Sequence, residues 1–288
     1  MAETFSIARA IVEAAQILRQ AGVPEARREA ASLIEHLTGC DRTFLITRAE
    51  TALASADVRR LRGLVERRAA GEPLQYITGR QDFYGLDFEV TTDVLIPRPE
   101  TELLVETALE LLDKTSQRPL ICDVGTGSGC IPIAILHERP QAQAVACDIS
   151  WPALRVAARN AARHNVRERL ALVASDCLDA IDGERARFSM LVSNPPYVAE
   201  EALAGLQREV RDHEPRVALT PGGNGLAIIR RLINDAPRFL ETGGHLLLEI
   251  GFDQHEAIAE LIDSKVWELL DIHKDLQGIP RIVALKKN

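Results

Sequence analysis

The chain has 288 residues, of which 46% are hydrophobic and 26% are charged, a composition typical of a soluble globular protein with room for two domains. Its formal net charge of −8 is unevenly distributed, because residues 1–75 carry 11 Arg against 10 acidic residues and the remainder carries 23 basic against 32 acidic residues. This acidic remainder argues against stable binding to nucleic acid, since gripping a duplex requires a basic surface that displaces counterions.

Residues 5–70 show the apolar periodicity of a helical bundle. Apolar residues recur at helical spacing at positions 7, 11, 14 and 18, and again at 26, 30, 33 and 37. A third helix is predicted to start at a Ser55 N-cap and to stop at Gly71. No titratable cluster stands out here, so we interpret residues 1–73 as an N-terminal helical domain that binds a partner and does not carry the chemistry.

Residues 74–93 are predicted to form a β-hairpin linker between two domains. The segments 76–78, 82–84 and 86–90 have β character, and Gly79 and Gly85 supply the breaks between them.

Residues 94–288 show the alternation of an α/β fold. A helix is predicted from the Pro97 region to about Leu112, with proline and acidic residues in its first turn. Strands are then predicted at 120–124, 144–148, 170–174, 188–193, 245–250, 266–272 and 281–285, and helices at 131–137, 151–164, 226–240 and 254–262. This order favours a doubly wound, mostly parallel sheet, which binds ligands at the carboxyl ends of its strands.

Neither a membrane segment nor a metal site is indicated. No apolar run is long enough to cross a bilayer, and residues 1–6 lack the basic and apolar regions of an export signal, so we expect a cytoplasmic protein. The five cysteines are odd in number, form no Cys-x-x-Cys pair and lie mostly in or beside apolar runs. This pattern indicates free buried thiols.

A glycine-rich loop follows the first strand of the predicted sheet. Residues 123–130 read DVGTGSGC, with glycine at 125, 127 and 129, and they open a helix whose free N–H groups face a ligand. A dinucleotide fingerprint would have its third glycine at the position of Cys130. The next strand ends in Asp148, 19 residues after Gly129, where a carboxylate accepts both hydroxyls of a ribose. The segment predicts a nucleoside site; the alternative is a tight turn with a capping Asp148.

The apolar strand 188–192 ends abruptly at Ser193-Asn194-Pro195-Pro196-Tyr197. Two prolines remove N–H donors from this bend and stiffen it, so it presents backbone carbonyls. The Asn194 side-chain oxygen and the Pro195 carbonyl can accept both hydrogens of a planar NH2 group, with the Tyr197 ring available for its flat face. Such a nitrogen is a poor nucleophile, and orienting it is worth as much as ~7–11 kcal/mol. The alternative is an ordinary Asn-Pro turn after a strand.

Together these motifs resemble S-adenosylmethionine-dependent methyltransferases that act on a planar amino nitrogen. The fuller pattern is similar to the glutamine methyltransferases that modify bacterial peptide-chain release factors, and it covers essentially the whole chain. The shared features are the helical N-terminal segment, the hairpin, LIPRPETE at 95–102, NPPY at 194–197, Glu214-Pro215 and GHLLLE at 244–249.

The resemblance implies a role for each motif. The cofactor S-adenosylmethionine would be held by Gly125, Thr126, Gly127, Ser128, Gly129, Asp148, Cys177 and Asn194. Asn194 and Pro195 would be the catalytic residues, and together with Pro196 and Tyr197 they would bind the substrate. Cys177 stands where relatives often carry a large aromatic residue beside the adenine.

The implied substrate is the glutamine of the Gly-Gly-Gln loop in a class I release factor. Its side-chain amide would become N5-methylglutamine, with S-adenosylhomocysteine as the second product. The implied mechanism requires neither a metal nor a histidine base. The composition and charge predict no membrane partner and no stable nucleic-acid partner. Glu249 is interpreted either as a support for the site or as a cap or ion pair, and Arg98 and Glu102 either as site residues or as helix-start residues.

Several other functions compete with this interpretation. A ribosomal-protein glutamine methyltransferase or an adenine-N6 DNA methyltransferase would share the turn and the glycine loop. The acidic second part and the absence of an evident target-recognition segment argue against the DNA enzyme. The position of Cys130 disfavours a nucleotide-dependent dehydrogenase, and a non-enzymatic adaptor would leave the turn and the loop unexplained.

Overall fold

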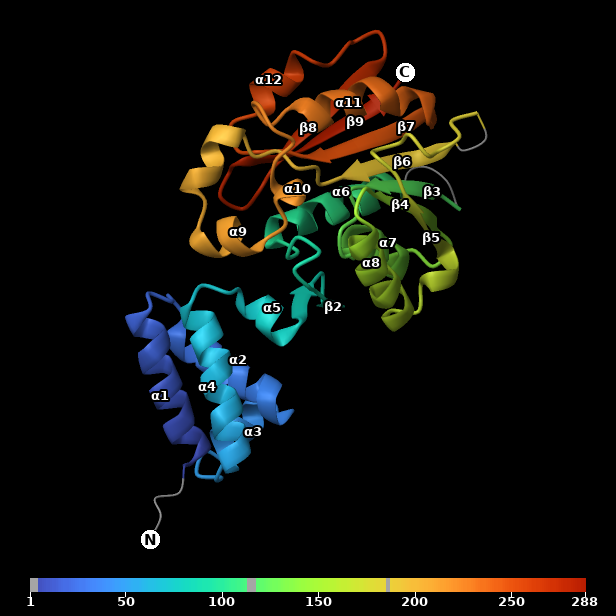
Figure 1. Ribbon diagram of the computed structural model, residues 1–288. Helices are drawn as coiled ribbons and strands as arrows, with labels where there is room; N and C mark the ends of the chain where they lie inside the picture. Colours follow the sequence, from blue (N-terminus) through green and yellow to red (C-terminus); the bar gives the residue numbers. More distant parts are fainter. Residues whose placement is uncertain (1–4, 113–117, 185–186) are drawn as a thin grey trace. The chain divides into compact units, whose positions relative to one another are not determined.

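The computed structural model describes residues 5–112, 118–184 and 187–288 (Figure 1). The chain forms two compact units. The first comprises Met1–Gly79 together with Gln207–His213, and the second comprises Arg80–Leu206 together with Glu214–Asn288. Each unit buries a hydrophobic core of its own.

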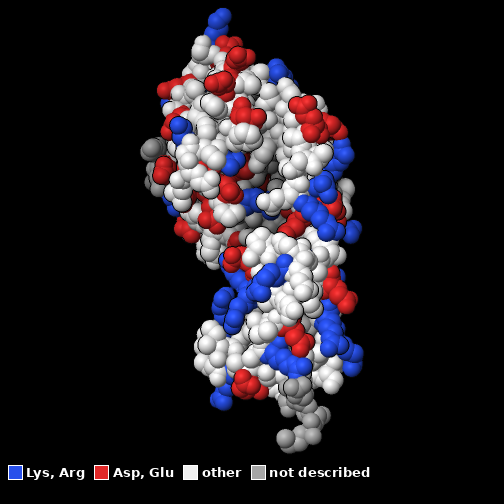
Figure 2. Space-filling view, turned by 90° about the vertical axis from the view of Figure 1, so that its left-hand side faces the viewer, with Lys and Arg blue, Asp and Glu red and all other residues white. Residues whose placement is uncertain are grey.

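The first unit is helical, as its periodicity predicts. Its helices are α1 (Ile7–Gln20), α2 (Ala26–Thr38), α3 (Arg42–Thr47), α4 (Ser55–Ala69), α5 (Leu74–Thr78) and α9 (Arg208–His213). The stripe residues Ile7, Leu18 and Leu33 are buried in one core cluster. Arginines of α4 such as Arg59 and Arg62 are exposed, and Figure 2 shows basic and acidic side chains together on the visible face of the unit that carries the N-terminus.

Two local predictions for the first unit are wrong. Ser55 is the first residue of α4, and Ala54 occupies the N-cap position without a side-chain hydrogen bond. Residues 76–78, expected as β structure, lie in helix α5, which starts after Pro73 and ends at Gly79 with a φ of 73°. A proline before the first turn and a left-handed glycine after the last are helix boundaries, and they outweigh the β propensity of three residues.

Segment 207–213 joins the first unit through a buried arginine. The Arg68 side chain is 3% exposed, and its guanidinium contacts Glu29 at 2.5 Å and Glu209 of α9 at 2.6 Å. Burial lowers the pKa of Arg68, but the hydrogen bonds and charges of Glu29 and Glu209 outweigh it, so the pKa is raised above its ordinary value. Breaking such a pair would leave a buried charge without compensation, so we expect α9 to stay attached to these helices.

The second unit is built on a seven-stranded sheet in the order β5-β4-β3-β6-β7-β9-β8 (Figure 1). Its strands are β3 (Leu120–Val124), β4 (Gln143–Asp148), β5 (Leu170–Ala174), β6 (Phe188–Ser193), β7 (Leu240–Glu249), β8 (Trp267–Lys274) and β9 (Pro280–Lys287). The strands from β5 to β7 run parallel, and β9 pairs antiparallel with both β7 and β8. The predicted α/β sheet is therefore confirmed.

Helices cover both faces of this sheet. Helices α6 (Glu102–Leu112), α7 (Cys130–Glu138) and α8 (Trp151–Arg163) bury apolar residues against one face, together with the hairpin of β1 (Arg80–Phe83) and β2 (Leu86–Glu89). Helices α11 (Ala227–Asp235) and α12 (His255–Ala259) cover the other face. Successive residues of one strand serve opposite layers, since Ile121 packs in the first cluster and Cys122 in the second.

The remaining departures lie at element ends. The helix predicted over 226–240 ends at Asp235, because Pro237 removes a backbone donor and residues 236–238 form the 3-10 turn η4 (Ala236–Arg238). Strand β7 therefore begins at Leu240, earlier than expected. The helix predicted from Pro97 begins as the 3-10 turn η1 (Pro99–Thr101) before α6. Five short elements were not predicted: α3, η2 (Arg167–Arg169), η3 (Glu200–Gly205), α9 and α10 (Arg216–Leu219).

Within the described ranges, no helix is both long enough and apolar enough to cross a bilayer.

Candidate active site

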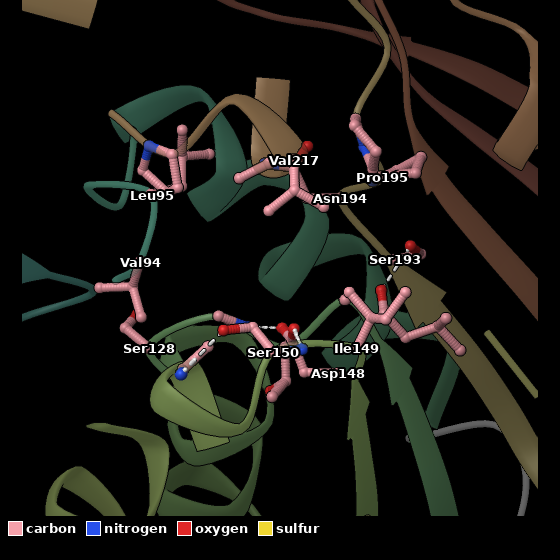
Figure 3. Close-up of a pocket in the computed structure, with 18 of the residues that line it drawn as sticks. Val94, Leu95, Ser128, Asp148, Ile149, Ser150, Ser193, Asn194, Pro195 and Val217 are labelled. Carbon is pink, nitrogen blue, oxygen red and sulfur yellow. Dashed lines mark hydrogen bonds between the residues drawn. The ribbon is translucent and has the colours of Figure 1, made fainter. Parts of the chain in front are cut away.

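A pocket of about 210 Å³ opens in the second unit at the carboxyl ends of β3, β4, β5 and β6 (Figure 3). Its wall includes most of the residues that the sequence singled out: Gly125, Thr126, Gly127, Ser128, Asp148, Cys177, Asn194, Pro195 and Pro196. Asp148 and Asn194 lie on different sides of the same space in Figure 3. The glycine loop and the proline turn, about 70 residues apart in the chain, therefore face one cavity, as expected for a doubly wound sheet.

Two of the singled-out residues do not line this wall. The Gly129 backbone has a φ of 81°, and a Cβ built there would lie 3.0 Å from Ile133 Cδ1 and 3.2 Å from Ala157 Cβ, so this glycine allows close packing of α7 and α8. The Tyr197 side chain packs against the core of the α11 face. Its hydroxyl donates to Glu249 Oε1 at 3.4 Å. The structure therefore does not place the Tyr197 ring on the cavity wall.

The glycine loop is tied to the end of β4. The backbone N–H groups of Gly125 and Thr126 both donate to the Cys147 carbonyl at 2.9 Å. Gly127 N–H donates to Asp148 Oδ2, and Ser150 N–H donates to Asp148 Oδ1, each at 2.8 Å. Burial raises the pKa of Asp148, and these backbone donors oppose the rise. A carboxylate has about four acceptor positions, so Asp148 keeps two for a ligand.

Two buried polar side chains at the loop have no hydrogen-bond partner among the described residues. The Thr126 hydroxyl lies on the cavity wall, is buried and has no hydrogen-bond partner among the described residues. The Asp123 carboxylate behind it is fully buried, and neither of its oxygens accepts a hydrogen bond there. A buried polar group is costly unless a partner satisfies it, so the Thr126 hydroxyl suits a ligand that brings a polar group to the loop.

The buried acids make a pH dependence of stability testable. Burial raises the pKa of Asp123 to about 7, and the negative charge of Asp148 adds to the rise. The neighbouring Thr126 hydroxyl opposes it, although the two groups do not have the geometry of a hydrogen bond. Burial likewise raises the pKa of Glu249 to about 7. Both values lie above the ordinary carboxyl values, so the folded state binds protons more tightly than the unfolded chain between about pH 4 and pH 7.

Without cofactor, the free energy of unfolding is therefore expected to be higher at pH 5.5 than at pH 8, by roughly 2–4 kcal/mol. Urea denaturation at the two pH values measures the difference. Asp123→Asn removes one of the two carboxyls and is expected to reduce the difference. Equal stability at the two pH values, or greater stability at pH 8, would contradict the burial of these acids.

The proline turn is held at each end. Ser193 Oγ donates to the Val124 carbonyl at 2.6 Å, which ties the start of the turn to β3. Asn194 Nδ2 donates to Thr101 Oγ1 at 3.1 Å. The Tyr197 carbonyl accepts a hydrogen bond of 2.9 Å from Gln254 Nε2. Because its flanking residues are fixed, the carbonyls of the turn keep one direction relative to the cavity.

A glycine packs directly against the end of this turn. A Cβ built on Gly225 would lie 2.1 Å from the Tyr197 carbonyl oxygen, and the residue has a φ of 82°. Gly223 also has a positive φ, 55°, but a Cβ built there meets nothing within 4 Å. A side chain would therefore strain the backbone at both positions, but only at Gly225 would it also collide with Tyr197.

We expect Gly225→Ala to lower turnover at least about tenfold, because the turn must move by an ångström or more to admit the methyl group. Gly223→Ala carries the strain alone and is expected to retain most of the turnover. The two variants are compared by their steady-state turnover and by the midpoints of their thermal unfolding. Equal loss of activity in both would show that the contact with Tyr197 has no special role.

Cys177 lies on the cavity wall, half-buried and with a φ of 49°. Burial raises the pKa of its thiol to about 11, Arg231 opposes the shift, and Asp176 adds to it. The thiol is therefore neutral at physiological pH and offers a small apolar surface. The adjacent Asp176 pairs with Arg231 at 2.7 Å, which keeps its charge at the rim.

The structure shows the contacts of three residues for which the sequence left two roles open. Arg98 lines the cavity and pairs with Glu214 at 2.5 Å. Glu102 Oε1 accepts the Tyr84 N–H at 2.7 Å, so it fastens the hairpin turn. Glu249 accepts hydrogen bonds from Thr101 and Tyr197 behind the cavity.

Other wall residues were missed by sequence reasoning. They include Val94, Thr101, Ile149, Ser150, Val217 and Thr220. Thr101 lies inside the motif at 95–102, so the motif was found but not the role of this residue. Val217 lies in α10, a four-residue helix with no signal beyond the preceding Glu214-Pro215.

Comparison with known proteins agrees with this architecture. Residues 9–79 match the family described as PrmC N-terminal domain, and residues 99–224 match the family described as Methyltransferase small domain. Among solved structures, the fold resembles a methyltransferase from Pyrococcus furiosus (TM-score 0.52, 17% identity, 80% of this chain and 98% of that chain). It also resembles the hMettl16 catalytic domain, solved in complex with the MAT2A 3'UTR hairpin 6 (TM-score 0.57, 16% identity, 81% and 82%).

The fold and the domain match define a methyltransferase, and its cofactor is S-adenosylmethionine. Much stronger similarity links the chain to proteins named release factor glutamine methyltransferase. The relative from Nitratidesulfovibrio vulgaris is 41% identical over 96% of this chain and 93% of its own length. The relative from Burkholderia pseudomallei is 43% identical over 93% of this chain and 94% of its own. The chain belongs to the release factor glutamine methyltransferase family.

Proposed function

We propose that the chain methylates the side-chain amide nitrogen of the glutamine in the Gly-Gly-Gln loop of class I peptide-chain release factors. The observation that carries the proposal is the orientation of Asn194. Its Nδ2 is engaged by Thr101, so its Oδ1 is left as an acceptor at the wall of the pocket that Asp148 and the glycine loop also line.

The cofactor would be held by residues that the pocket already brings together. Asp148 has two acceptor positions left for the ribose hydroxyls, and the loop from Gly125 to Ser128 would cradle the methionine end. Cys177 would offer an apolar contact to the base, and Asn194 borders both ligands. S-adenosylmethionine supplies an electrophilic methyl group carried on a sulfonium.

Asn194 Oδ1 and the Pro195 carbonyl would each accept one hydrogen of the glutamine NH2. This arrangement fixes the plane of the amide and directs its nitrogen lone pair into the cavity, which is catalysis by orientation. Pro196 would complete the contact surface, and Tyr197 would support the turn from behind. The N-methylated amide is acidic while it carries a positive charge, so water or a carbonyl suffices to take its proton.

We also propose the division of labour between the parts of the chain. Residues 1–73 would form most of the substrate-binding domain, to which α5 and α9 also belong. Residues 94–288 without α9 would form the methyltransferase domain, and the hairpin of the 74–93 linker packs on its sheet. The match of residues 9–79 to the PrmC N-terminal domain supports the first assignment. Because translation termination takes place there, the enzyme would act in the cytoplasm.

To test the proposal, the protein is incubated with isotope-labelled S-adenosylmethionine in three separate reactions, which contain a class I release factor, ribosomal proteins or DNA. The expected result is one added methyl group, mapped by mass spectrometry to the glutamine of the Gly-Gly-Gln loop. A release factor with glutamate at that position is the control and is expected to stay unmodified. If methyl groups were found only on ribosomal proteins, or only on adenine in DNA, the release factor would not be the substrate and the methylated molecule would take its place.

A further inference from the structure

A chain of buried hydrogen bonds runs from the wall of the pocket, at Asn194 and Thr101, to Glu249 behind it. Thr101 Oγ1 donates to Glu249 Oε2 at 2.6 Å and accepts from Asn194 Nδ2 at 3.1 Å. Thr101 and Glu249 are each 2% exposed. The three residues come from η1, the end of β7 and the turn after β6, and the side-by-side pairing of β6 and β7 brings the last two together.

The direction of these hydrogen bonds follows from the chemistry of the groups. The Asn194 NH2 group can only donate, an ionised Glu249 can only accept, and the Thr101 hydroxyl has a single proton. Thr101 must therefore give its proton to Glu249 and present its lone pair to Asn194. Turning the Asn194 carboxamide over would bring two acceptors together and leave a buried group unsatisfied.

We propose that Thr101 and Glu249 are positioning residues that lock the Asn194 carboxamide with its oxygen toward the substrate. The inference rests on the proposed function for the identity of that substrate. Neither residue needs to touch the reacting atoms. Their effect is to keep the acceptor, and not the donor, of Asn194 at the cavity wall.

The protonation of Glu249 controls the direction of the chain. Its pKa is raised by burial and by the charge of Glu100 of η1, and it is lowered by the Thr101 hydroxyl, by the charge of Arg281 of β9 and by the Tyr197 hydroxyl. When Glu249 carries a proton, it can donate to Thr101, which then donates to Asn194. This reversed order favours the turned-over carboxamide, whose NH2 group cannot accept a substrate N–H.

Thr101→Val keeps the shape of the side chain and removes the hydroxyl. We expect it to lower kcat about 10- to 100-fold on the release factor, because a displaced orienting group costs catalysis of that order. KM and the calorimetric affinity for S-adenosylhomocysteine are expected to stay within about threefold. Thr101→Ser restores the hydroxyl and is expected to recover most of the lost kcat.

Thr107→Val is the matched control. Thr107 is 3% exposed, like Thr101, but its hydroxyl donates to the Leu103 carbonyl of its own helix at 2.8 Å. Wild-type kcat in Thr107→Val is the expected result. Equal losses in both Val variants, wild-type kcat in Thr101→Val, or no recovery in Thr101→Ser would overturn the positioning role.

The pH profile gives a second readout that a purely structural role would not move. The kcat of the wild type is expected to rise about tenfold from pH 6 to pH 8, as Glu249 ionises. Glu249→Gln has no such titration, and its carbonyl can accept from Thr101 at every pH, so its profile is expected to be flat. A wild-type profile that persists in Glu249→Gln would contradict the inference.

The locked carboxamide can also be observed without substrate. NMR of a 15N-labelled sample shows the Asn194 NH2 signals, identified by their loss in Asn194→Ala. They are expected to shift between pH 6 and pH 8 in the wild type and to lose that shift in Glu249→Gln. Failure of the wild type to methylate a release factor would contradict the proposed function, but the NMR experiment would still report the orientation of the Asn194 carboxamide. Asn194 NH2 signals that do not shift between pH 6 and pH 8 in the wild type would contradict the positioning role of Thr101 and Glu249.

Discussion

Asn194→Ala is expected to abolish methyl transfer, with a fall in kcat on the order of 10³-fold or more. The substitution removes the side-chain oxygen that holds one substrate N–H and leaves only the Pro195 carbonyl, so the amide plane is no longer fixed. Release-factor methylation followed by mass spectrometry measures the loss.

The rest of the site is expected to survive in this variant. The glycine loop is held by Cys147 and Asp148, not by Asn194. Calorimetric affinity for S-adenosylhomocysteine should therefore change by no more than about fivefold, within the range of a single lost neutral hydrogen bond. Wild-type turnover by Asn194→Ala would remove the orienting role on which the mechanism depends.

Asp148→Ala is expected to weaken cofactor binding by roughly 10²- to 10⁴-fold. The variant loses two charge-assisted hydrogen bonds to the ribose, each worth about 1.5–3 kcal/mol at most. It also releases Gly127 N–H and Ser150 N–H, which the Asp148 carboxylate now holds at 2.8 Å. Titration calorimetry with S-adenosylhomocysteine measures the affinity.

Asp176→Ala is the matched control for this change. Asp176 lies at the end of the next strand and also borders the cavity, but its carboxylate is engaged by Arg231 at 2.7 Å. We expect a change in affinity of about threefold or less, as for an ion pair near the surface. If both Asp variants bound the cofactor equally well, Asp148 would not be the ribose ligand.

Much of the fold follows from local sequence signals. The strands of the sheet and the helices α7 and α8 are strongly periodic or continuously apolar, and apart from the start of β7 their bounds were predicted to within about two residues. The errors lie where a proline or a glycine competes with a longer pattern. Pro237 ends the helix expected to reach residue 240, and Pro73 with Gly79 makes a short helix of residues expected as β structure.

The site residues likewise fall into those that local sequence signals predict and those that only tertiary packing determines. Asp148 ends one strand of a parallel sheet and Asn194 follows another, so the sequence places them at one edge and predicts that they share a pocket. The bond from Thr101 to Glu249 joins residues 148 positions apart, and a single sequence carries no signal for such a pair. Gly129 and Tyr197 show the converse, since their motifs predict ligand contact and tertiary packing directs both away from the cavity wall.

The central claim is that the Asn194-Pro195 bend holds the flat NH2 of a glutamine beside the cofactor. The most direct measurement is a crystal structure of the full chain with S-adenosylhomocysteine and a class I release factor. The account predicts Asn194 Oδ1 and the Pro195 carbonyl oxygen each about 3 Å from the glutamine amide nitrogen. A glutamine bound elsewhere, or Asn194 presenting its nitrogen to the substrate, would contradict it.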